Sequence, residues 1–89
     1  MDVKFDIVDE LAVLSERNGG WSKEFNLVSW NERSPKFDIR DWDSTHEKMG
    51  KGVTLSREEA YELHLALVKI FGQGHGGKIA KDILQIAKD

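Results

Sequence analysis

The sequence contains no cysteine, which excludes a disulfide framework, a thiol nucleophile and any zinc site built on thiolates. This absence fits a reducing compartment. No stretch approaches the roughly 18 apolar residues of a membrane span, and the N-terminus MDVKFDIVDE lacks both the basic start and the apolar run of a signal peptide. We therefore expect a soluble, cytoplasmic protein.

The chain is also short and carries little net charge. Its 89 residues suggest one domain, and a domain of this size buries only about 60% of its unfolded surface, so a second copy or a partner is expected. A net charge of −3 argues weakly against nucleic acid. The acid excess, however, lies in residues 1–20, whereas residues 21–52 balance six cations against six acids and hold all three tryptophans.

Alternating apolar and polar residues predict four strands. The first is interrupted at Val8-Asp9-Glu10, which indicates a bulge, although a helix from Asp9 to Arg17 is an alternative. Asn18-Gly19 strongly predicts a hairpin turn. Pro35, the only proline, disfavours a helix in the turn between the second and third predicted strands. The predicted strands span residues 3–16, 21–31, 36–43 and 53–56, with a polar loop before the fourth.

A helix is predicted over residues 57–71, because Ser56 to Glu59 form a capping box. Its apolar residues form two adjacent stripes, whereas covering a sheet needs only one, so the helix is expected to dimerise with its own copy as well. The stripes consist of Ala60, Leu63, Leu67, Ile70 and Phe71, and of Tyr61, Leu65 and Val68.

These elements predict an α+β fold, in which a four-stranded antiparallel meander is followed by one helix packed on one face. Residues 1–71 form the expected domain, and residues 72–77 read as a glycine-rich linker. Residues 78–89 form a short amphipathic C-terminal helix with no assigned role.

No constellation of residues predicts catalysis, a metal site or a cofactor. The three histidines, His46, His64 and His75, have no ligand spacing, and no pair of carboxylates stands out. The segment GQGHGG follows a helix, whereas a phosphate-binding loop follows a strand, so this segment is predicted to be a linker. We therefore expect a protein that is not an enzyme.

The third predicted strand, KFDIRDW, raises the question of binding. Phe37, Ile39 and Asp41 would share a core-facing side, which leaves Lys36, Asp38, Arg40 and Trp42 facing water. An exposed tryptophan beside cations either packs against another part of the protein or stacks a nucleobase while the cations hold phosphates. The tryptophans and cations gathered in residues 21–52 favour binding, and Lys48 and Lys51 in KMGKG could accept a phosphate.

The segments GWSKEFNLVSWN and KFDIRDWDSTHEKMGKGVTLSREEAYEL resemble the transcriptional coactivator "positive cofactor four" family, and most closely its bacterial YdbC-type single-stranded DNA-binding proteins. The resemblance covers roughly residues 3–71. It implies a curved sheet, dimerisation through the 57–71 helix, and binding of single-stranded DNA without strong sequence preference, on melted DNA in the nucleoid.

Family contacts map onto this sequence as lysines, arginines and aromatic residues of the second and third strands and of the loop that follows. Trp42 is expected to stack a base, Arg40 and Lys36 to hold phosphates, and Lys48 and Lys51 to close over the strand from the loop. The second strand contributes further candidates, which are Trp21, Lys23 and Trp30.

The resemblance therefore predicts a homodimeric single-stranded DNA-binding protein that supports transcription regulation, replication or repair, with RNA as another possible ligand. The alternative is a transcription coregulator that acts mainly as a protein-interaction module and meets a transcription or repair protein through its exposed tryptophans and tail. The overall acidity of the chain favours this alternative. The two predictions differ in salt dependence, which is steep only for binding to phosphates.

Overall fold

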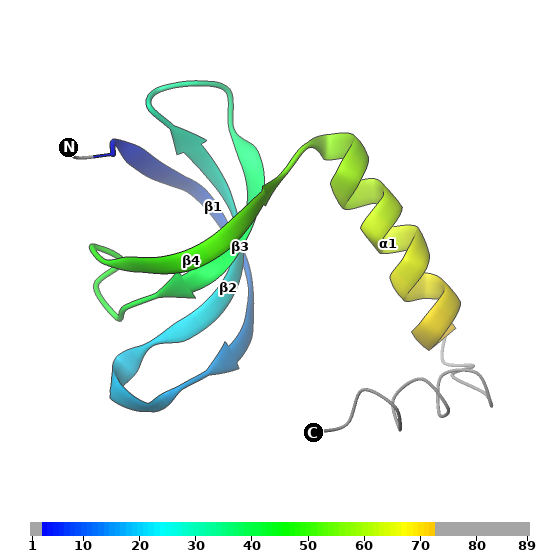
Figure 1. Ribbon diagram of the computed structural model, residues 1–89, viewed down its shortest axis with the longest axis horizontal. Coiled ribbons are helices and arrows are strands. Elements are labelled where there is room, and N and C mark those ends of the chain that lie inside the picture. Colours follow the sequence, from blue (N-terminus) through cyan, green and yellow to red (C-terminus); the bar gives the residue numbers. More distant parts are fainter. Residues whose placement is uncertain (1–2, 73–89) are drawn as a thin grey trace. The chain divides into compact units, whose positions relative to one another are not determined.

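The computed structural model describes residues 3–72 of the chain (Figure 1). Residues 73–77 of the predicted linker 72–77 and the whole predicted tail 78–89 lie outside the described residues. The chain forms two compact units, one that ends at Arg57 and one that begins at Glu58. The extent of the predicted domain, 1–71, and the packing of the helix on the sheet stay predictions.

The first unit is an open four-stranded sheet with strand order β1-β2-β3-β4 and antiparallel pairing throughout. This confirms the predicted meander, and the helix that follows it confirms the α+β class. The strands are β1 (Phe5–Glu16), β2 (Ser22–Trp30), β3 (Lys36–Trp42) and β4 (Met49–Leu55).

The strand β1 is extended over its whole length, so the alternative of a helix from Asp9 is wrong. Its register against β2 shifts between Ile7 and Asp9, where the sequence indicated a bulge, and at two later points. A 3₁₀ turn, η1 (Asn18–Gly20), joins the two strands. Positive φ falls on Gly19 and Gly20, at 80° and 82°, which glycine adopts without strain.

The strand β4 begins at Met49, four residues before the predicted start at Val53. Its glycines suggested a loop, but Gly52 is instead a point of close contact between strands. A side-chain carbon at Gly52 would overlap the Cβ of Arg40 and the carbonyl oxygen of Ile39. Glycine is therefore required for β4 to lie against β3 at this position.

The sheet bows strongly and has a concave inner face (Figure 1). Phe5 pairs with Trp30 at one end of β2, and Trp42 pairs with Ser22 at the other end. A straight strand of this length would separate these ends by about 26 Å. The rings of Phe5 and Trp42 are nevertheless 5.1 Å apart between centroids, so the curvature of the sheet brings its two ends together over its inner face.

The inner face forms the core of this unit. It buries Val28 and Trp42 completely, together with the polar side chains of Glu24, Asn26 and Asp38. The prediction that Phe37, Ile39 and Asp41 face the core while Asp38, Arg40 and Trp42 face water is therefore wrong. Alternation assigned the residues of β3 to two faces correctly, but only the direction of curvature decides which face is enclosed.

The outer face of the sheet carries an apolar patch that is only half-buried. The rings of Phe25 and Phe37 stack on it with centroids 5.6 Å apart, and Val53 is 49% exposed. Half-buried Leu27 and Ile39 continue this surface. The outer face thus remains available for packing.

The helix α1 (Arg57–Phe71) has the bounds of the predicted helix, and all of it except Arg57 belongs to the second unit. None of its residues is buried. Members of both predicted apolar stripes are exposed, including Tyr61, Leu63, Leu65, Leu67, Val68 and Phe71.

Candidate nucleic-acid interface

Arg40 and Asp38 form a paired charge on the inner face. The Arg40 Nε donates to Asp38 Oδ1 at 2.6 Å, and its Nη2 donates to Oδ2 at 2.9 Å. The carboxylate of Asp38 is fully buried, and the side chain of Arg40 is 14% exposed. Thr54 donates a further hydrogen bond to Asp38 at 2.9 Å. Arg40 is thus held by a buried partner, rather than projecting freely into water as the sequence suggested.

The guanidinium of Arg40 also lies over the indole of Trp30, 4.8 Å from the ring centroid. Phe5 contacts the same indole at a centroid distance of 6.1 Å. Trp30 is only half-buried, and its Nε1 has no hydrogen-bond partner. This ring is therefore held by two neighbours and remains partly accessible, and base stacking needs an accessible ring.

Trp42 is completely buried, so its expected exposure is wrong. Its ring contacts Phe5, and His46 at 5.8 Å. An indole enclosed in this way has no free ring face for a base. Of the two explanations that the sequence left open for Trp42, packing within the protein is the correct one.

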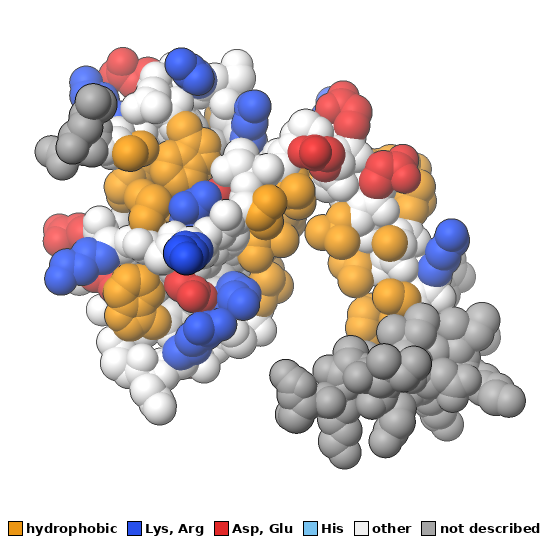
Figure 2. All heavy atoms as spheres, in the orientation of Figure 1, with side chains coloured by type: hydrophobic (Ala, Val, Ile, Leu, Met, Phe, Trp, Pro, Cys, Tyr) orange, Lys and Arg blue, Asp and Glu red, His pale blue; other side chains and the backbone are white. Residues whose placement is uncertain are grey.

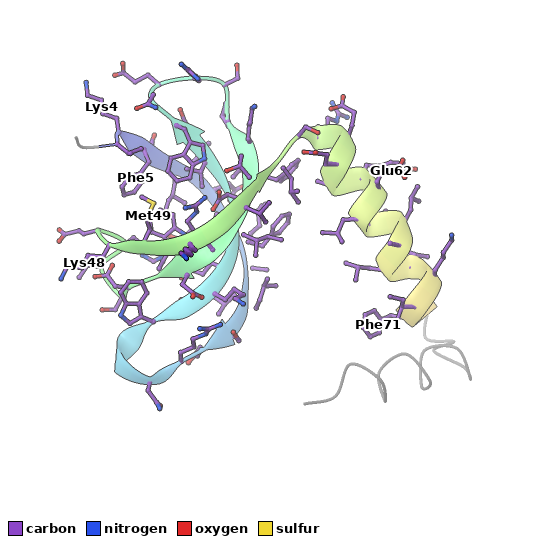
Figure 3. All side chains as sticks on the ribbon, viewed as in Figure 1. Lys4, Phe5, Lys48, Met49, Glu62 and Phe71 are labelled. Carbon is purple, nitrogen blue, oxygen red and sulfur yellow. The ribbon has the colours of Figure 1, made fainter. Side chains whose placement is uncertain are left out.

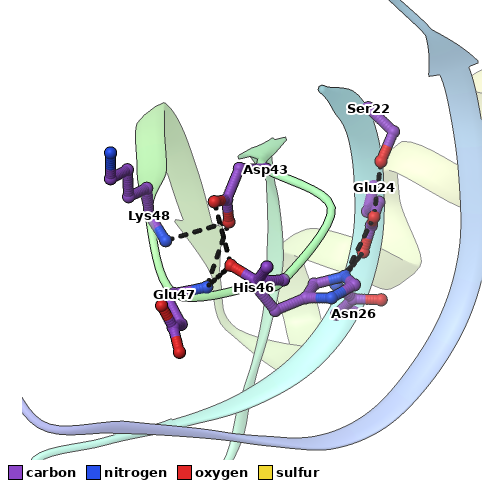
Figure 4. Close-up of polar contacts among 8 residues, drawn as sticks. Ser22, Glu24, Asn26, Asp43, His46, Glu47 and Lys48 are labelled. Atoms are coloured by element: carbon purple, nitrogen blue, oxygen red, sulfur yellow. Dashed lines mark hydrogen bonds and ion pairs between the residues drawn. The ribbon is translucent and has the colours of Figure 1, made fainter. Parts of the chain in front are cut away.

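Glu24 is the centre of a second polar cluster on the inner face (Figure 4). It accepts hydrogen bonds from Ser22 at 2.5 Å and Asn26 at 3.0 Å, and His46 Nε2 lies 2.9 Å from its Oε1. Burial raises the pKa of Glu24, but these hydrogen bonds and the charge of His46 lower it by more, so the carboxyl has a pKa below its ordinary value.

The loop between β3 and β4 is organised by Asp43 (Figure 4). Its Oδ1 accepts from the backbone amides of Glu47 and Lys48, both at 3.0 Å, and its Oδ2 accepts from Thr45. The amide of Lys48 is the main reason that the pKa of Asp43 lies below its usual value. The loop is thus fixed by its own side chains, while the side chain of Lys48 extends away from it (Figure 3).

The lysines predicted to bind DNA differ in exposure and in the face of the sheet on which they lie. Lys36, Lys48 and Lys51 are exposed. Lys36 shares the face of Arg40, but Lys23 pairs with Asp41 and therefore lies on the outer face, away from Trp30. The structure thus does not bring Lys23 together with the other candidates. Figure 2 shows lysine and arginine side chains interleaved with hydrophobic ones on the visible face of the sheet.

Trp21 lines a pocket of about 270 Å³ beside the β1–β2 turn. Its neighbours there include Arg17, Glu24, Ser44 and His46. The sequence analysis missed the involvement of Glu24 and His46 and the contact of Phe5 with Trp30. No local pattern could reveal these associations, because the curvature of the sheet creates them.

The described residues contain no helix that is long and apolar enough to cross a membrane. Within residues 3–72, no group of three or more histidine, aspartate or glutamate side chains is arranged to hold a metal ion. The polar groups of the inner face instead form compact pairs and small clusters.

Comparison with known proteins identifies the family of the chain. Residues 17–65, which contain β2, β3, β4 and the first part of α1, match the family model described as Transcriptional Coactivator p15 (PC4). The chain belongs to the PC4 family. It is also 44% identical over 62 residues to an uncharacterized protein of Treponema pallidum (strain Nichols), in an alignment that covers 70% of this chain and 73% of that protein.

PC4 domains are known for nucleic-acid binding and transcriptional coactivation. Nucleic-acid binding is therefore a property of the family to which this chain belongs. The resemblance seen in the sequence is thereby confirmed at the level of the family.

Proposed function

We propose that this protein is a homodimer that binds single-stranded DNA without strong sequence preference and supports transcription, replication or repair in the bacterial cytoplasm. Binding, without catalysis or a cofactor, is the activity proposed. The observation that carries the proposal is the partly exposed Trp30 indole, supported by Arg40 on the concave inner face of a PC4-type sheet.

A single strand needs flat apolar surfaces for its bases and cations for its phosphates. Trp30 supplies a fixed aromatic surface, and base stacking on such a ring contributes roughly 1–3 kcal/mol regardless of base identity. The exposed Lys36, Lys48 and Lys51 supply cations. Arg40 supports Trp30 from within the protein, so in this proposal its first role is to position the ring.

The dimer is proposed on the basis of two apolar surfaces. The outer sheet face is half-buried, and α1 exposes side chains from both of its apolar stripes, Phe71 at 50% and Tyr61 at 58%. A small domain gains stability by covering such surfaces with a second copy.

The test is a titration of an end-labelled thymine oligomer of about 20 nucleotides, followed by fluorescence anisotropy at several salt concentrations. Affinity should fall with log salt by about 0.7 per phosphate contacted. Lys48→Ala should weaken binding and reduce this slope by about 0.7 if the lysine contacts one phosphate. Trp30→Ala should weaken binding with little change in slope.

The matched control is Lys69→Ala, which removes the same charge from the exposed last turn of α1 and should leave the slope unchanged. Absence of binding at low salt would contradict the proposal. The exposed apolar residues of α1 would then favour the second candidate, a coregulator that binds a transcription or repair protein. Such an interface would show little salt dependence.

A further inference from the structure

We propose that His46 is a positioning residue for the contact of Lys48 with DNA. The imidazole of His46 connects the loop between β3 and β4 to β2, and this connection holds the backbone of Lys48 next to the inner face of the sheet. The inference rests on the proposed function, because it explains how one of the proposed phosphate-binding cations is kept in place. The residues that carry it all lie in the first unit of the chain.

The hydrogen bonds inside the loop determine its shape. Asp43 accepts from the backbone amides of Glu47 and Lys48. The amide of Asp43 in turn donates to the carbonyl oxygen of Lys48 at 3.1 Å, and the amide of His46 donates to the carbonyl oxygen of Asp43 at 3.0 Å. These contacts join loop residues to one another, so they leave the position of the loop relative to β2 to be set by other contacts.

His46 makes such a contact with β2 (Figure 4). Its Nε2 lies 2.9 Å from Oε1 and 3.1 Å from Oε2 of Glu24, which is 22 positions away in the chain. The side chain of Glu24 is only 7% exposed, and Ser22 and Asn26 donate to the same carboxylate. Hydrogen bonds to an ionised group are stronger than those between neutral groups. The loop is therefore attached to a buried carboxylate that other residues already hold in place.

The backbone of His46 adopts a conformation that costs energy locally. Its φ is 61°, in the left-handed region that is unfavourable for residues other than glycine. The ring of His46 also packs against Trp42, with centroids 5.8 Å apart, and Trp42 is completely buried. The hydrogen bond to Glu24 and this packing offset the backbone cost, so the side chain of His46 stabilises the observed position of the loop.

The end of the loop lies beside the proposed base-stacking residue. Lys48 directly precedes Met49, the first residue of β4, and the sulfur of Met49 lies 3.7 Å from Nη1 of Arg40. The guanidinium of Arg40 lies over the indole of Trp30. The side chain of Lys48 is exposed and extends away from the loop (Figure 3). A shift of the loop would therefore move this ammonium group relative to a strand whose base stacks on Trp30.

The test is a double-mutant cycle on the affinity for an end-labelled thymine oligomer of about 20 nucleotides, measured by fluorescence anisotropy. His46→Ala removes the connection to β2 and keeps Lys48. At about 50 mM salt it should weaken binding about two- to eightfold, since one phosphate contact with a salt slope of 0.7 contributes about eightfold relative to 1 M salt. It should also reduce the salt slope, as Lys48→Ala does. In the Lys48→Ala background, His46→Ala should have no further effect, because His46 acts through the lysine.

Three variants separate positioning from a general loss of structure. Lys36→Ala removes an exposed cation that the loop does not carry, so its effect should multiply with that of His46→Ala. His46→Gln keeps a side-chain N–H donor for Glu24 and should restore most of the affinity. If His46→Ala does not fold, His46→Gly replaces it in the cycle, because glycine adopts a positive φ without strain.

The outcomes separate this inference from the proposed function. Failure of the wild type to bind the oligomer at low salt would overturn the proposed function itself. If the wild type binds, wild-type affinity in either Lys48→Ala or His46→Ala would overturn the positioning role and leave single-strand binding intact. An effect of His46→Ala that persists in full without Lys48, or a glutamine variant that binds as weakly as the alanine variant, would overturn it as well. A reduced salt slope together with no further loss in the double variant would support it.

Discussion

Replacement of Asp38 by alanine tests the structure most directly, because it removes one partner of a buried ion pair. The carboxylate is fully buried and binds the Arg40 guanidinium through two hydrogen bonds, of 2.6 and 2.9 Å. Without it, a guanidinium that is 14% exposed loses its counter-ion, and the hydroxyl of Thr54 loses its acceptor.

Removal of one partner from a buried pair typically costs about 3–5 kcal/mol, because the remaining charge stays desolvated. Two contacts retain part of the Arg40 environment, since Nη1 lies 3.3 Å from the carbonyl oxygen of Gly50 and 3.7 Å from the sulfur of Met49. We therefore expect the lower end of the range, about 3 kcal/mol. With an m-value of about 1.5 kcal/mol per M, the urea midpoint should fall by about 2 M.

The assay is urea unfolding followed by tryptophan fluorescence, at a fixed protein concentration because a dimer would make stability concentration-dependent. Thr54→Val should cost only about 1 kcal/mol, the value of one hydrogen bond. The double variant Asp38→Leu with Arg40→Met should recover most of the lost stability, since apolar replacement of both partners is often neutral. A midpoint shift below about 0.5 M for Asp38→Ala, or a double variant no more stable than the single one, would refute the reasoning.

Two further predictions concern the same inner face. Trp42→Ala should lower the free energy of unfolding by about 3–5 kcal/mol, the usual cost of truncating a buried tryptophan. Urea unfolding measures this loss, and a loss below about 1 kcal/mol would contradict the burial of Trp42. The pKa of Glu24 is lowered on folding, so its stabilising contribution is present above its ordinary value of 4.5 and is lost as pH falls through the folded value. The difference in unfolding free energy between wild type and Glu24→Gln should therefore shrink as pH falls from about 5 to 3, and a pH-independent difference would contradict the Glu24 cluster.

Local patterns predicted most of the fold. Alternation located β1, β2 and β3 to within a few residues, and Ser56 correctly preceded the start of α1. The early start of β4 escaped prediction because Gly50 and Gly52 are typical of loops as well as of close strand contacts. Only the position of Arg40 and Ile39 across the strand pair shows why Gly52 is required.

The candidate site was harder to predict than the fold. Sequence reasoning correctly placed Arg40, Asp38 and Trp42 on one face of β3, but treated that face as solvent-exposed. An alternating pattern shows which residues share a face of a strand, but it does not show which of the two faces is buried. An aspartate in a sequence is expected at the surface, because aspartates are rarely buried unless they are paired. Curvature, which depends on the whole sheet, decided that Trp42 is core whereas Trp30 stays partly accessible.

The location of the buried carboxylates also explains why an acidic protein can belong to a nucleic-acid-binding family. Asp38 is bound by Arg40, and Glu24 lies within hydrogen-bond distance of Ser22, Asn26 and His46, so both buried carboxylates have partners within the protein. Much of the acid excess falls on residues 1–20, which include the edge strand β1. Net charge alone is therefore a poor guide to whether a protein of this family binds nucleic acid.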